Sequence, residues 1–383
     1  VEWGAIISQI RRKEEIARKD AERIGEGEGF TGSLVRLRLT TEPPDRIPPL
    51  IGKQATAHDT TRELMRDFGG YDKEVHFYRD FADQVSLPSP RCFAAEYDPD
   101  TGAFVLLLED LAPGRVGDQV EGATLETARQ VVDALAEFHA RWWNTEDLAA
   151  ARWLLPPDDV AADFIRLFDE GMPAVRELWG ARYPELTSLV SRTRRFLPEV
   201  FEMFASGDLP RPYTVVHGDM RLDNLFFPTD EGGRFAVVDW QGIALGHPAN
   251  DLSYWLVLSL PVDLRRSHEE SLLARYHRGL RRHGVGGYSL RALRRDYRNT
   301  ATVLLGGAPV LFNNLDMSSD RGQALVDAIG VRVDAAMKDL NAARTLRILP
   351  WYLRGLRAQR ATARLLGDLL RRVQRAGRAA RRR

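Results

Sequence analysis

Cysteine is almost absent from this chain, which has only Cys92 among its 383 residues. A single cysteine cannot form an intrachain disulfide, so the sequence excludes a disulfide-stabilised secreted domain and favours a reducing compartment. Cys92 lies in the segment SPRCFAAEY, a context that favours a small buried strand residue over a nucleophile.

Long apolar runs and an excess of charge of one sign are also missing. The most apolar stretches, near residues 252–262 and 302–312, are shorter than the roughly 18–20 residues that span a bilayer. The first twenty residues contain no signal-peptide core. Lys plus Arg equals Asp plus Glu, at 54 each, so net charge indicates no nucleic-acid partner. The sequence therefore predicts a soluble, cytoplasmic protein.

The first 110 residues show mainly strand patterns. Strands are expected near residues 34–39, 50–56, 91–97 and 104–109. A helix is expected over residues 60–84 and a short, charged amphipathic helix over residues 5–20. This segment, residues 1–110, is predicted to form a small β-rich domain.

Helical patterns dominate the rest of the chain. They cover residues 124–143 and 160–205 and resume from 265 onward. Three short apolar strands interrupt them at 215–216, 225–227 and 235–238, and the polar turn PTDEGG joins the last two into a hairpin. We therefore expect a helical domain over residues 111–345 with a hairpin inserted in it. A basic, amphipathic helical tail follows over residues 346–383. That tail either packs on the body as a solvated helix or makes a weak contact with an anionic surface.

The segment TVVHGDMRLDNLFF places polar side chains between two of those short strands. Asp219 follows His217 by two residues, Asn224 follows Asp219 by five, and Asp239 ends the hairpin. Because a hairpin returns its far end to its start, these side chains can converge. Two carboxylates and an amide supply hard oxygen ligands, which suit Mg²⁺ bound with phosphate.

This spacing follows the logic of a kinase active site. The sequence HGD, an Asn five residues later, then DWQ and GHPANDLSYW resembles the aminoglycoside phosphotransferase and choline kinase-like superfamily. It is most similar to the ecdysteroid kinase-like branch, over roughly residues 20–340. The resemblance implies an α+β, protein-kinase-like fold with a small β-rich N-terminal lobe and a larger helical C-terminal lobe.

The resemblance also implies the site residues. Asp219 would be the catalytic base, in a loop supported by His217, while Asn224 and Asp239 would hold Mg²⁺ on the phosphates of ATP or GTP. The helix residue Asp251 would fix the catalytic loop through backbone amides. The remaining nucleotide-binding residues would be the glycine turn Gly25, Gly27 and Gly29, the strand lysine Lys53 with its partner Glu74, and the crossover residues Glu109 and Leu111.

The sequence leaves the hydroxyl acceptor open among aminoglycosides, macrolides, sterol-like compounds and other alcohols. Acidic residues within 158–170 would suit a polycation, whereas Trp142, Trp143, Trp153, Tyr254 and Trp255 could line an apolar pocket or form ordinary helix core. The alternative function is a catalytically silent kinase-like module that binds nucleotide or a partner. A protein kinase is disfavoured because no peptide-docking A-P-E segment follows Asp239.

Overall fold

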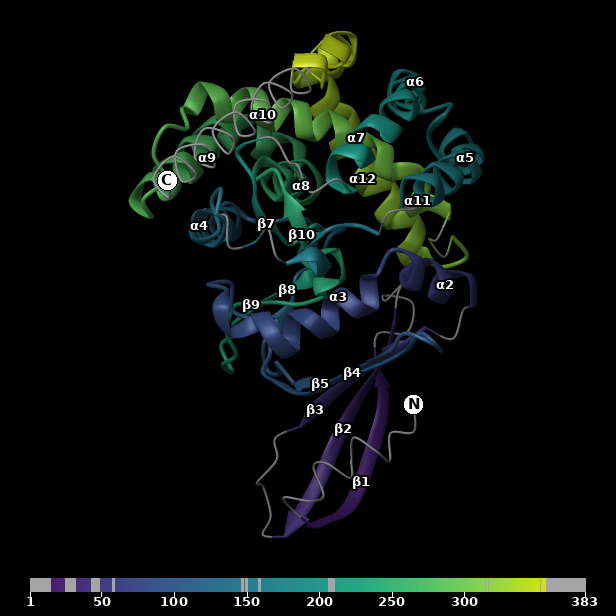
Figure 1. Cartoon of the computed structure of the whole chain (residues 1–383), viewed down its shortest axis with the longest axis vertical. Coiled ribbons are helices and arrows are strands. Elements are labelled where there is room, and N and C mark those ends of the chain that lie inside the picture. Colours follow the sequence, from purple (N-terminus) through teal and green to yellow (C-terminus); the bar gives the residue numbers. More distant parts are fainter. Residues whose placement is uncertain are drawn as a thin grey trace, which may run out of the picture.

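The computed structural model describes residues 15–24, 32–42, 49–56, 59–145, 148, 151–157, 160–205, 211–313, 315, 317–351 and 353–355. Figure 1 shows a strand-rich part at the bottom of the view and a larger helical part above it, with α3 between the two. This arrangement confirms the expected α+β class and its division into two lobes.

Five antiparallel strands form the main sheet, in the order β1-β2-β3-β5-β4. The strands are β1 (Glu15–Ile24), β2 (Gly32–Glu42), β3 (Leu50–Ala55), β4 (Cys92–Asp98) and β5 (Ala103–Glu109). The expected helix over residues 5–20 is wrong for residues 15–20, which belong to β1, and residues 5–14 lie outside the described part. β1 pairs with β2 from Glu15↔Glu42 to Ile24↔Leu34. Those pairings give the backbone of β1 hydrogen-bond partners along the whole strand. A short isolated helix in water would be less stable than this paired strand.

The helix expected over residues 60–84 is interrupted. It comprises α2 (Asp59–Asp67), α3 (Gly70–His76), a π-helical turn (Phe77–Phe81) and a 3₁₀ turn (Ala82–Gln84). Gly69 has a φ of 69°, in the left-handed region, and separates α2 from α3. The break lets α3 lie against the sheet, where the Tyr71 ring stacks on Phe104 with centroids 4.7 Å apart.

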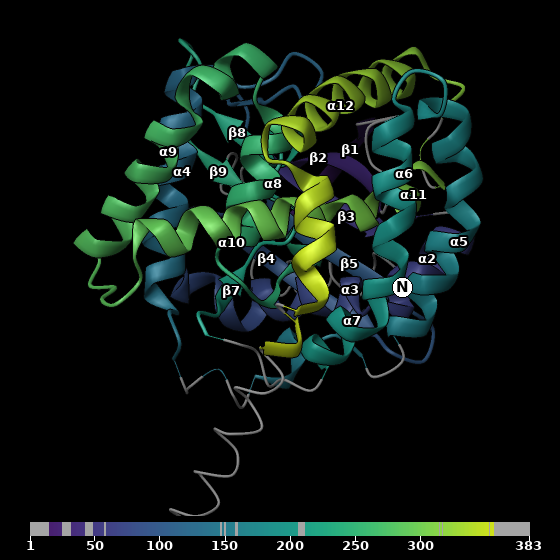
Figure 2. The ribbon, with the colours of Figure 1, turned by 90° about the horizontal axis from the view of Figure 1, so that it is seen from above.

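The larger part is built from helices, as expected. The described helices are α4 (Leu125–Arg141), α5 (Val160–Trp179), α6 (Pro184–Thr193), α7 (Leu197–Ala205), α8 (Ala249–Ser259), α9 (Val262–Arg282), α10 (Leu290–Val303), α11 (Ala308–Asn313) and α12 (Asp320–Asp339). Seen from above in Figure 2, α4 and α9 lie together on one side, and α5, α6 and α11 gather on the other. None of the described helices is long and apolar enough to cross a membrane.

Two small sheets lie between the main sheet and the helices (Figure 1). One contains β6 (Arg115–Val116), β8 (Leu225–Phe227) and β9 (Ala236–Val237), and the other contains β7 (Thr214–Val216) and β10 (Ala244–Gly246). β8 pairs with β9 through Leu225↔Val237 and Phe226↔Ala236, which confirms the predicted hairpin. These short strands bring the loops after β7 and β9 to neighbouring positions.

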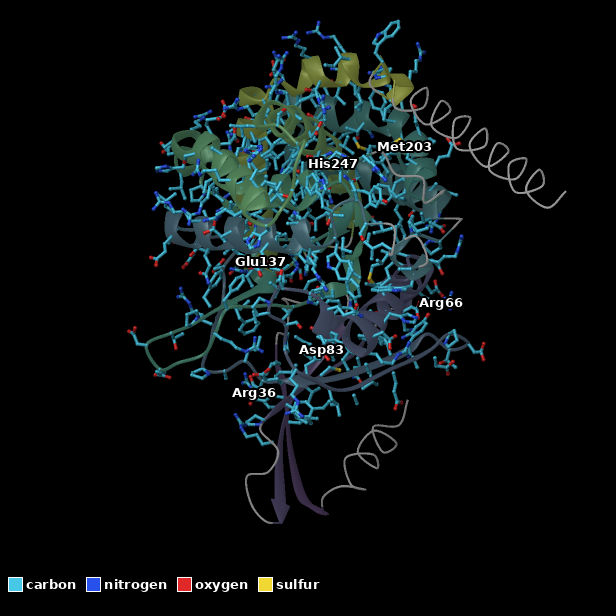
Figure 3. All side chains as sticks on the ribbon, turned by 60° about the vertical axis from the view of Figure 1, so that its left-hand side comes forward. Arg36, Arg66, Asp83, Glu137, Met203 and His247 are labelled. Atoms are coloured by element: carbon cyan, nitrogen blue, oxygen red, sulfur yellow. The ribbon has the colours of Figure 1, made fainter. Side chains whose placement is uncertain are left out.

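Side chains from both parts share one hydrophobic core. Phe77 and the buried Trp240 stack with ring centroids 3.8 Å apart, which joins the helix on the sheet to the loop after β9. Figure 3 shows how side chains fill the space from Arg36 on the sheet to His247 in the helical part. Because the two parts are packed together at this core, the site between them has a fixed frame.

The proposed domain boundaries at residues 110 and 345 stay predictions. β5 ends at Glu109, directly before the first boundary, and helical structure continues through residues 342–351, across the second. Residues 356–383 of the proposed tail lie outside the described part of the chain.

Candidate active site

The loop between β7 and β8 carries the HGD sequence and is held in a conformation that requires glycine. Gly218 has a φ of 87°, and a Cβ added there would lie 2.2 Å from the carbonyl oxygen of Gly242. An L-residue would therefore meet both an unfavourable backbone conformation and a backbone clash. The loop can pass this close to residue 242 only with glycine at position 218.

Asp251 of α8 fixes the same loop through its backbone. Its carboxylate accepts hydrogen bonds from the amides of His217 at 2.7 Å and Gly218 at 2.9 Å, and it also contacts Nε2 of His139 at 3.2 Å. Burial acts to raise the pKa of Asp251, but the His139 hydrogen bond and neighbouring charges outweigh it, so the pKa is lowered. The network is completed by Tyr276, whose hydroxyl lies 2.7 Å from Nδ1 of His139.

The His217 ring is fully buried and uses both nitrogens within the loop. Nε2 lies 3.1 Å from the carbonyl oxygen of Val238, and Nδ1 accepts a hydrogen bond from the Asp219 amide at 3.2 Å. These contacts assign the proton to Nε2. His217 therefore ties the loop after β7 to the end of β9 instead of facing an acceptor.

Asp219 and Asn224 are in direct contact. The Asn224 side-chain amide donates to Oδ2 of Asp219 at 2.8 Å and to the Asp219 carbonyl oxygen at 2.9 Å. The Asp219 side chain remains 30% exposed, so part of its carboxylate is open to a substrate. The backbone carbonyl oxygen of Asn224 accepts a hydrogen bond from the backbone amide of Val238. This bond brings Asp239, the next residue, beside the Asp219–Asn224 pair.

Asp239 has a φ of 65° and a ψ of 65°, an uncommon left-handed conformation for a residue other than glycine. Oδ1 of Asp239 accepts a hydrogen bond from Nζ of Lys53 at 2.8 Å, across 186 positions of sequence. Burial acts to raise the pKa of Asp239, but the Lys53 ammonium outweighs it and lowers that pKa. The carboxylate is therefore held in its ionised form.

Lys53 lies in β3 and also contacts Glu74 of α3. Its ammonium donates to both carboxylate oxygens of Glu74 at 2.9 Å. Burial acts to lower the pKa of Lys53, but the two carboxylates outweigh burial and raise it. A permanently charged ammonium is thus positioned where the small lobe meets the catalytic loop.

Arg221 is a site residue that the sequence did not identify, because an arginine in a polar loop usually faces solvent. The structure buries it instead, with Nε 3.3 Å from Oδ2 of Asp219 and Nη1 3.6 Å from Oδ2 of Asp223. Burial acts to lower the pKa of Arg221, but the Asp219 carboxylate and other charges outweigh it and raise that pKa. Tyr254 lies beside the same carboxylate, and burial and Asp219 raise its pKa well above the usual value.

Gln119 is a second residue that the sequence did not reveal. Its side chain is buried, and its oxygen accepts from the Leu222 amide at 2.9 Å while its nitrogen donates to the Leu258 carbonyl at 2.7 Å. Arg332 of α12 in turn donates to the carbonyl oxygens of Gln119 and Val120. An isolated glutamine in a loop has no sequence pattern, so only the folded structure shows that it supports the catalytic loop.

The other predicted nucleotide-binding residues are less informative. Gly25, Gly27 and Gly29 lie outside the described residues. Oε2 of Glu109 accepts from the Arg91 amide and from the Arg234 side chain, at 3.0 and 2.8 Å. The carbonyl oxygen of Leu111 accepts from the Gly114 amide at 2.8 Å. Their role at an adenine edge stays a prediction.

The oxygen donors beside the loop suit a magnesium ion bound with phosphate. The side-chain nitrogen of Asn224 faces Asp219, which leaves the side-chain oxygen of Asn224 as a possible metal ligand. One carboxylate oxygen of Asp239 is likewise not used by Lys53. Carboxylate and amide oxygens are the donors that Mg²⁺ prefers. Among the described residues, no cluster of three or more His, Cys, Asp or Glu side chains forms a metal site from protein groups alone. The donor set therefore fits an ion that shares its coordination with nucleotide.

Three of the acidic residues expected to suit a polycation are already paired, and the other two, Asp158 and Asp159, lie outside the described residues. Asp169 binds Arg194 at 2.7 Å, and Asp163 and Glu170 both contact Arg166, at 3.4 and 3.3 Å. Of the aromatic residues, Trp142 is 8% exposed and Trp255 is fully buried, whereas Trp143, Trp153 and Tyr254 are half-buried.

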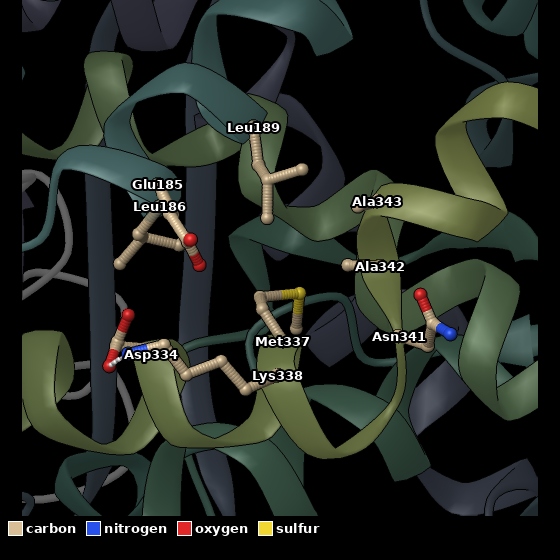
Figure 4. A pocket seen from close by; sticks show the side chains of 9 residues that line it. All are labelled: Glu185, Leu186, Leu189, Asp334, Met337, Lys338, Asn341, Ala342 and Ala343. Atoms are coloured by element: carbon tan, nitrogen blue, oxygen red, sulfur yellow. Dashed lines mark hydrogen bonds and ion pairs between the residues drawn. The ribbon is translucent and has the colours of Figure 1, made fainter.

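A cavity of about 240 Å³ lies between α6 and α12, away from these residues. Figure 4 shows Leu186, Leu189 and Met337 around it, with the ion pair of Lys338 and Asp334 at its edge. None of the predicted site residues lines this cavity. It is separate from the candidate active site.

Comparison with known proteins agrees with the geometry. A model of the ecdysteroid kinase-like family matches residues 26–284. An uncharacterised kinase-like protein of Caenorhabditis elegans is 25% identical over 257 residues, which are 63% of this chain and 64% of that protein. A probable acyl-CoA dehydrogenase of Arabidopsis thaliana is 22% identical over 232 residues, 59% of this chain but only 25% of the relative.

Solved structures show the same fold. Choline kinase from Cryptosporidium parvum superimposes with a TM-score of 0.52 and 12% identity, covering 91% of this chain and 99% of that one. At this identity the likeness concerns the fold alone, which is the two-lobed, kinase-like fold expected from the HGD, Asn and DWQ spacing.

Proposed function

The chain belongs to the ecdysteroid kinase-like family, and we propose that it transfers the γ-phosphate of ATP to a hydroxyl group of a small molecule. The observation that supports this proposal most is the position of Lys53. Its ammonium bridges Glu74 of the small lobe and Asp239 beside the catalytic loop. A cation that spans these two carboxylates is what a kinase uses to align nucleotide phosphates with the metal-binding aspartate.

In the proposed mechanism, the open part of the Asp219 carboxylate accepts the proton of the acceptor hydroxyl as its oxygen attacks the γ-phosphorus. Asn224 and Arg221 hold Asp219 in place, and Lys53 neutralises charge on the α- and β-phosphates. Mg²⁺, held by Asn224 and Asp239, would offset the charge of the phosphate oxygens when bound. Catalysis then comes from positioning and charge stabilisation, with no phosphoenzyme required.

The acceptor class is proposed as an alcohol of low net charge. Asp163, Asp169 and Glu170 of α5 are paired with arginines, so among the described residues these three do not form the open acidic lining that a polycationic aminoglycoside would need. Macrolides, sterol-like alcohols and other neutral alcohols remain.

The direct test is nucleotide turnover with Mg²⁺ across a panel of these alcohols, with aminoglycosides and choline included. The Asp219→Ala variant is run beside the wild type, and removal of a general base is expected to reduce kcat by about 10²–10⁴-fold. Replacing ATP with GTP in the same panel identifies the donor.

Each outcome decides between the proposal and its alternative. Acceptor-dependent transfer that is lost in Asp219→Ala supports the phosphotransferase. Nucleotide binding without transfer to any acceptor, equal in both proteins, would instead support the catalytically silent module.

A further inference from the structure

A second cavity lies where α3 meets the loop before α5. It has a volume of about 260 Å³, just below the ~300–1,000 Å³ of sites for drug-sized ligands. α3 contributes Asp72 and Lys73, and the segment before α5 contributes Arg152, Trp153 and residues 155–157. None of the residues placed in the phosphotransfer mechanism lines it, so it is distinct from the candidate active site.

Lys73 is the unusual residue of this cavity. Its side chain is only 9% exposed, and among the described residues no hydrogen bond or ion pair engages its ammonium. The ammonium therefore faces the open space of the cavity, and the carboxylate of Asp72 acts on it only through space, without a hydrogen bond or ion pair. The chain has only five lysines, and Lys53 and Lys338 illustrate the usual case, since each is paired with a carboxylate.

The other lining residues define what could supply the missing partner. Arg152 adds a second cation and Asp72 one carboxylate, so the described residues that line the cavity carry one net positive charge. Its walls are otherwise apolar, with Leu155, Pro156 and the indole of Trp153. The Trp153 ring is itself fixed, because it stacks on His76 of α3 with centroids 5.6 Å apart.

We propose that this cavity binds a small organic carboxylate, with the carboxylate between Lys73 and Arg152 and the apolar body against Trp153. A single negative charge matches the net charge of the lining, whereas a dianionic phosphate would be left partly uncompensated. The size of the cavity excludes a nucleotide. Because Lys73 directly precedes Glu74, the ligand would bind the same helix that holds Lys53.

The first experiment titrates benzoate and hexanoate into the full chain by calorimetry at pH 7, with benzamide as the neutral analogue of benzoate. We expect at least one carboxylate to bind, and benzamide to bind at least tenfold more weakly than benzoate. If neither carboxylate binds with a Kd below about 10 mM, or if benzamide matches benzoate, the proposal is overturned.

Variants then locate the site. Lys73→Met keeps the length of the side chain without its charge and should weaken binding at least tenfold. Lys338→Met, at a lysine whose side chain is 58% exposed and paired with Asp334, is the matched control and should leave binding unchanged. The exposed Arg152→Gln should weaken binding about threefold or more and guards against misfolding of the Lys73 variant. Unchanged binding in both site variants contradicts the proposal.

Proton uptake gives a readout that a purely structural lysine would not show. Burial lowers the pKa of Lys73 to about 8 despite the nearby carboxylate of Asp72. The charged groups lining the cavity with it are Asp72, which also contacts His76, and Arg152. A bound carboxylate favours the ammonium, so binding at pH 8 should take up about half a proton per site, and none in Lys73→Met. Calorimetry in two buffers of different ionisation enthalpy measures this number, and zero uptake by the wild type at pH 8 would overturn the role of Lys73.

Discussion

Two clusters in this molecule bury carboxylates beside cationic or imidazole groups, and they differ in how completely they do so. In the Lys53 cluster (Lys53, Glu74 and Asp239), the Asp239 side chain is 26% exposed. In the Asp251 cluster (Asp251, His139 and Tyr276), the side chains of Asp251 and His139 are both fully buried from solvent.

The difference follows from what each carboxylate is bonded to. Asp251 receives two backbone amides and an imidazole, so its acceptor capacity is largely filled by groups that cannot leave. Asp239 is bonded to one flexible side chain, Lys53, which uses only one of its two carboxylate oxygens. A carboxylate that supports structure is saturated with donors, whereas one suited to bind a ligand is left partly open.

The largest expected effect on activity comes from a substitution in the Lys53 cluster. Asp239→Asn should lower kcat for phosphate transfer by about 10³-fold, or about 4 kcal/mol of transition-state stabilisation, because it removes a metal-binding charge. The free energy of unfolding should change by only about 1 kcal/mol, since Lys53 keeps Glu74. Kinetics and urea unfolding measure the two quantities. Asp230→Asn, at an exposed turn, is the control, and an activity loss below tenfold would contradict the assignment of Asp239.

A substitution in the Asp251 cluster is expected to lower mainly the free energy of unfolding. Asp251→Ala leaves the amides of His217 and Gly218 without acceptors inside the protein, and should cost about 3 kcal/mol of unfolding free energy. Urea denaturation followed by circular dichroism measures this loss. The exposed Asp263→Ala, also near the start of a helix, should change stability by less than about 0.5 kcal/mol. Equal losses in the two variants would show that the Asp251 cluster has no special structural role.

A pair of glycine substitutions tests how tightly the Asp251 cluster holds the loop between β7 and β8. Gly218→Ala combines a left-handed φ of 87° with a Cβ 2.2 Å from the Gly242 carbonyl oxygen, and should cost about 2–3 kcal/mol. Gly284→Ala has a similar φ of 93° but open space around the new methyl group, so about 1 kcal/mol is expected. Thermal unfolding of both variants separates the steric contribution from the backbone one. A smaller loss for Gly218→Ala than for Gly284→Ala would mean that the loop is free to move.

The smallest effect concerns pH and the charge of Asp251. Its pKa is lowered, so the ionised group stabilises the fold above its unfolded pKa of about 3.9. That contribution is lost as the pH falls through the lower folded pKa. Asp251→Asn cannot lose it, and its unfolding free energy should therefore fall less steeply than that of the wild type below about pH 5. Parallel slopes for the two proteins would show that Asp251 carries no lowered pKa.

Much of the fold was predictable because its signals are local. Alternating apolar residues identified β2 to β5, and the turn PTDEGG identified the β8–β9 hairpin. The spacing of the loop and the hairpin also predicted that Asp219, Asn224 and Asp239 can converge, and the structure joins Asp219 to Asn224 by a hydrogen bond. Their catalytic roles stay a proposal.

What the sequence could not supply depends on contacts between distant segments. β1 has a helix-like charge pattern and becomes a strand only because β2 pairs with it. In the sequence Arg221 resembles a surface residue, but in the fold its guanidinium lies beside the carboxylates of Asp219 and Asp223. The break at Gly69 did have a signal, the pair Gly69-Gly70, which marks a place where a long helix is apt to end.

The bonds from Arg332 to Gln119 have a consequence for truncation. The family match ends at residue 284, yet α12 begins at Asp320 and supplies both Arg332 and Arg321, which binds Asp118 and Asp223. A fragment cut at the end of the matched segment would keep every proposed catalytic residue and lose the two side chains that support the loop around them. A fragment designed to keep the proposed activity should therefore extend through α12, beyond the boundary that sequence similarity alone would choose.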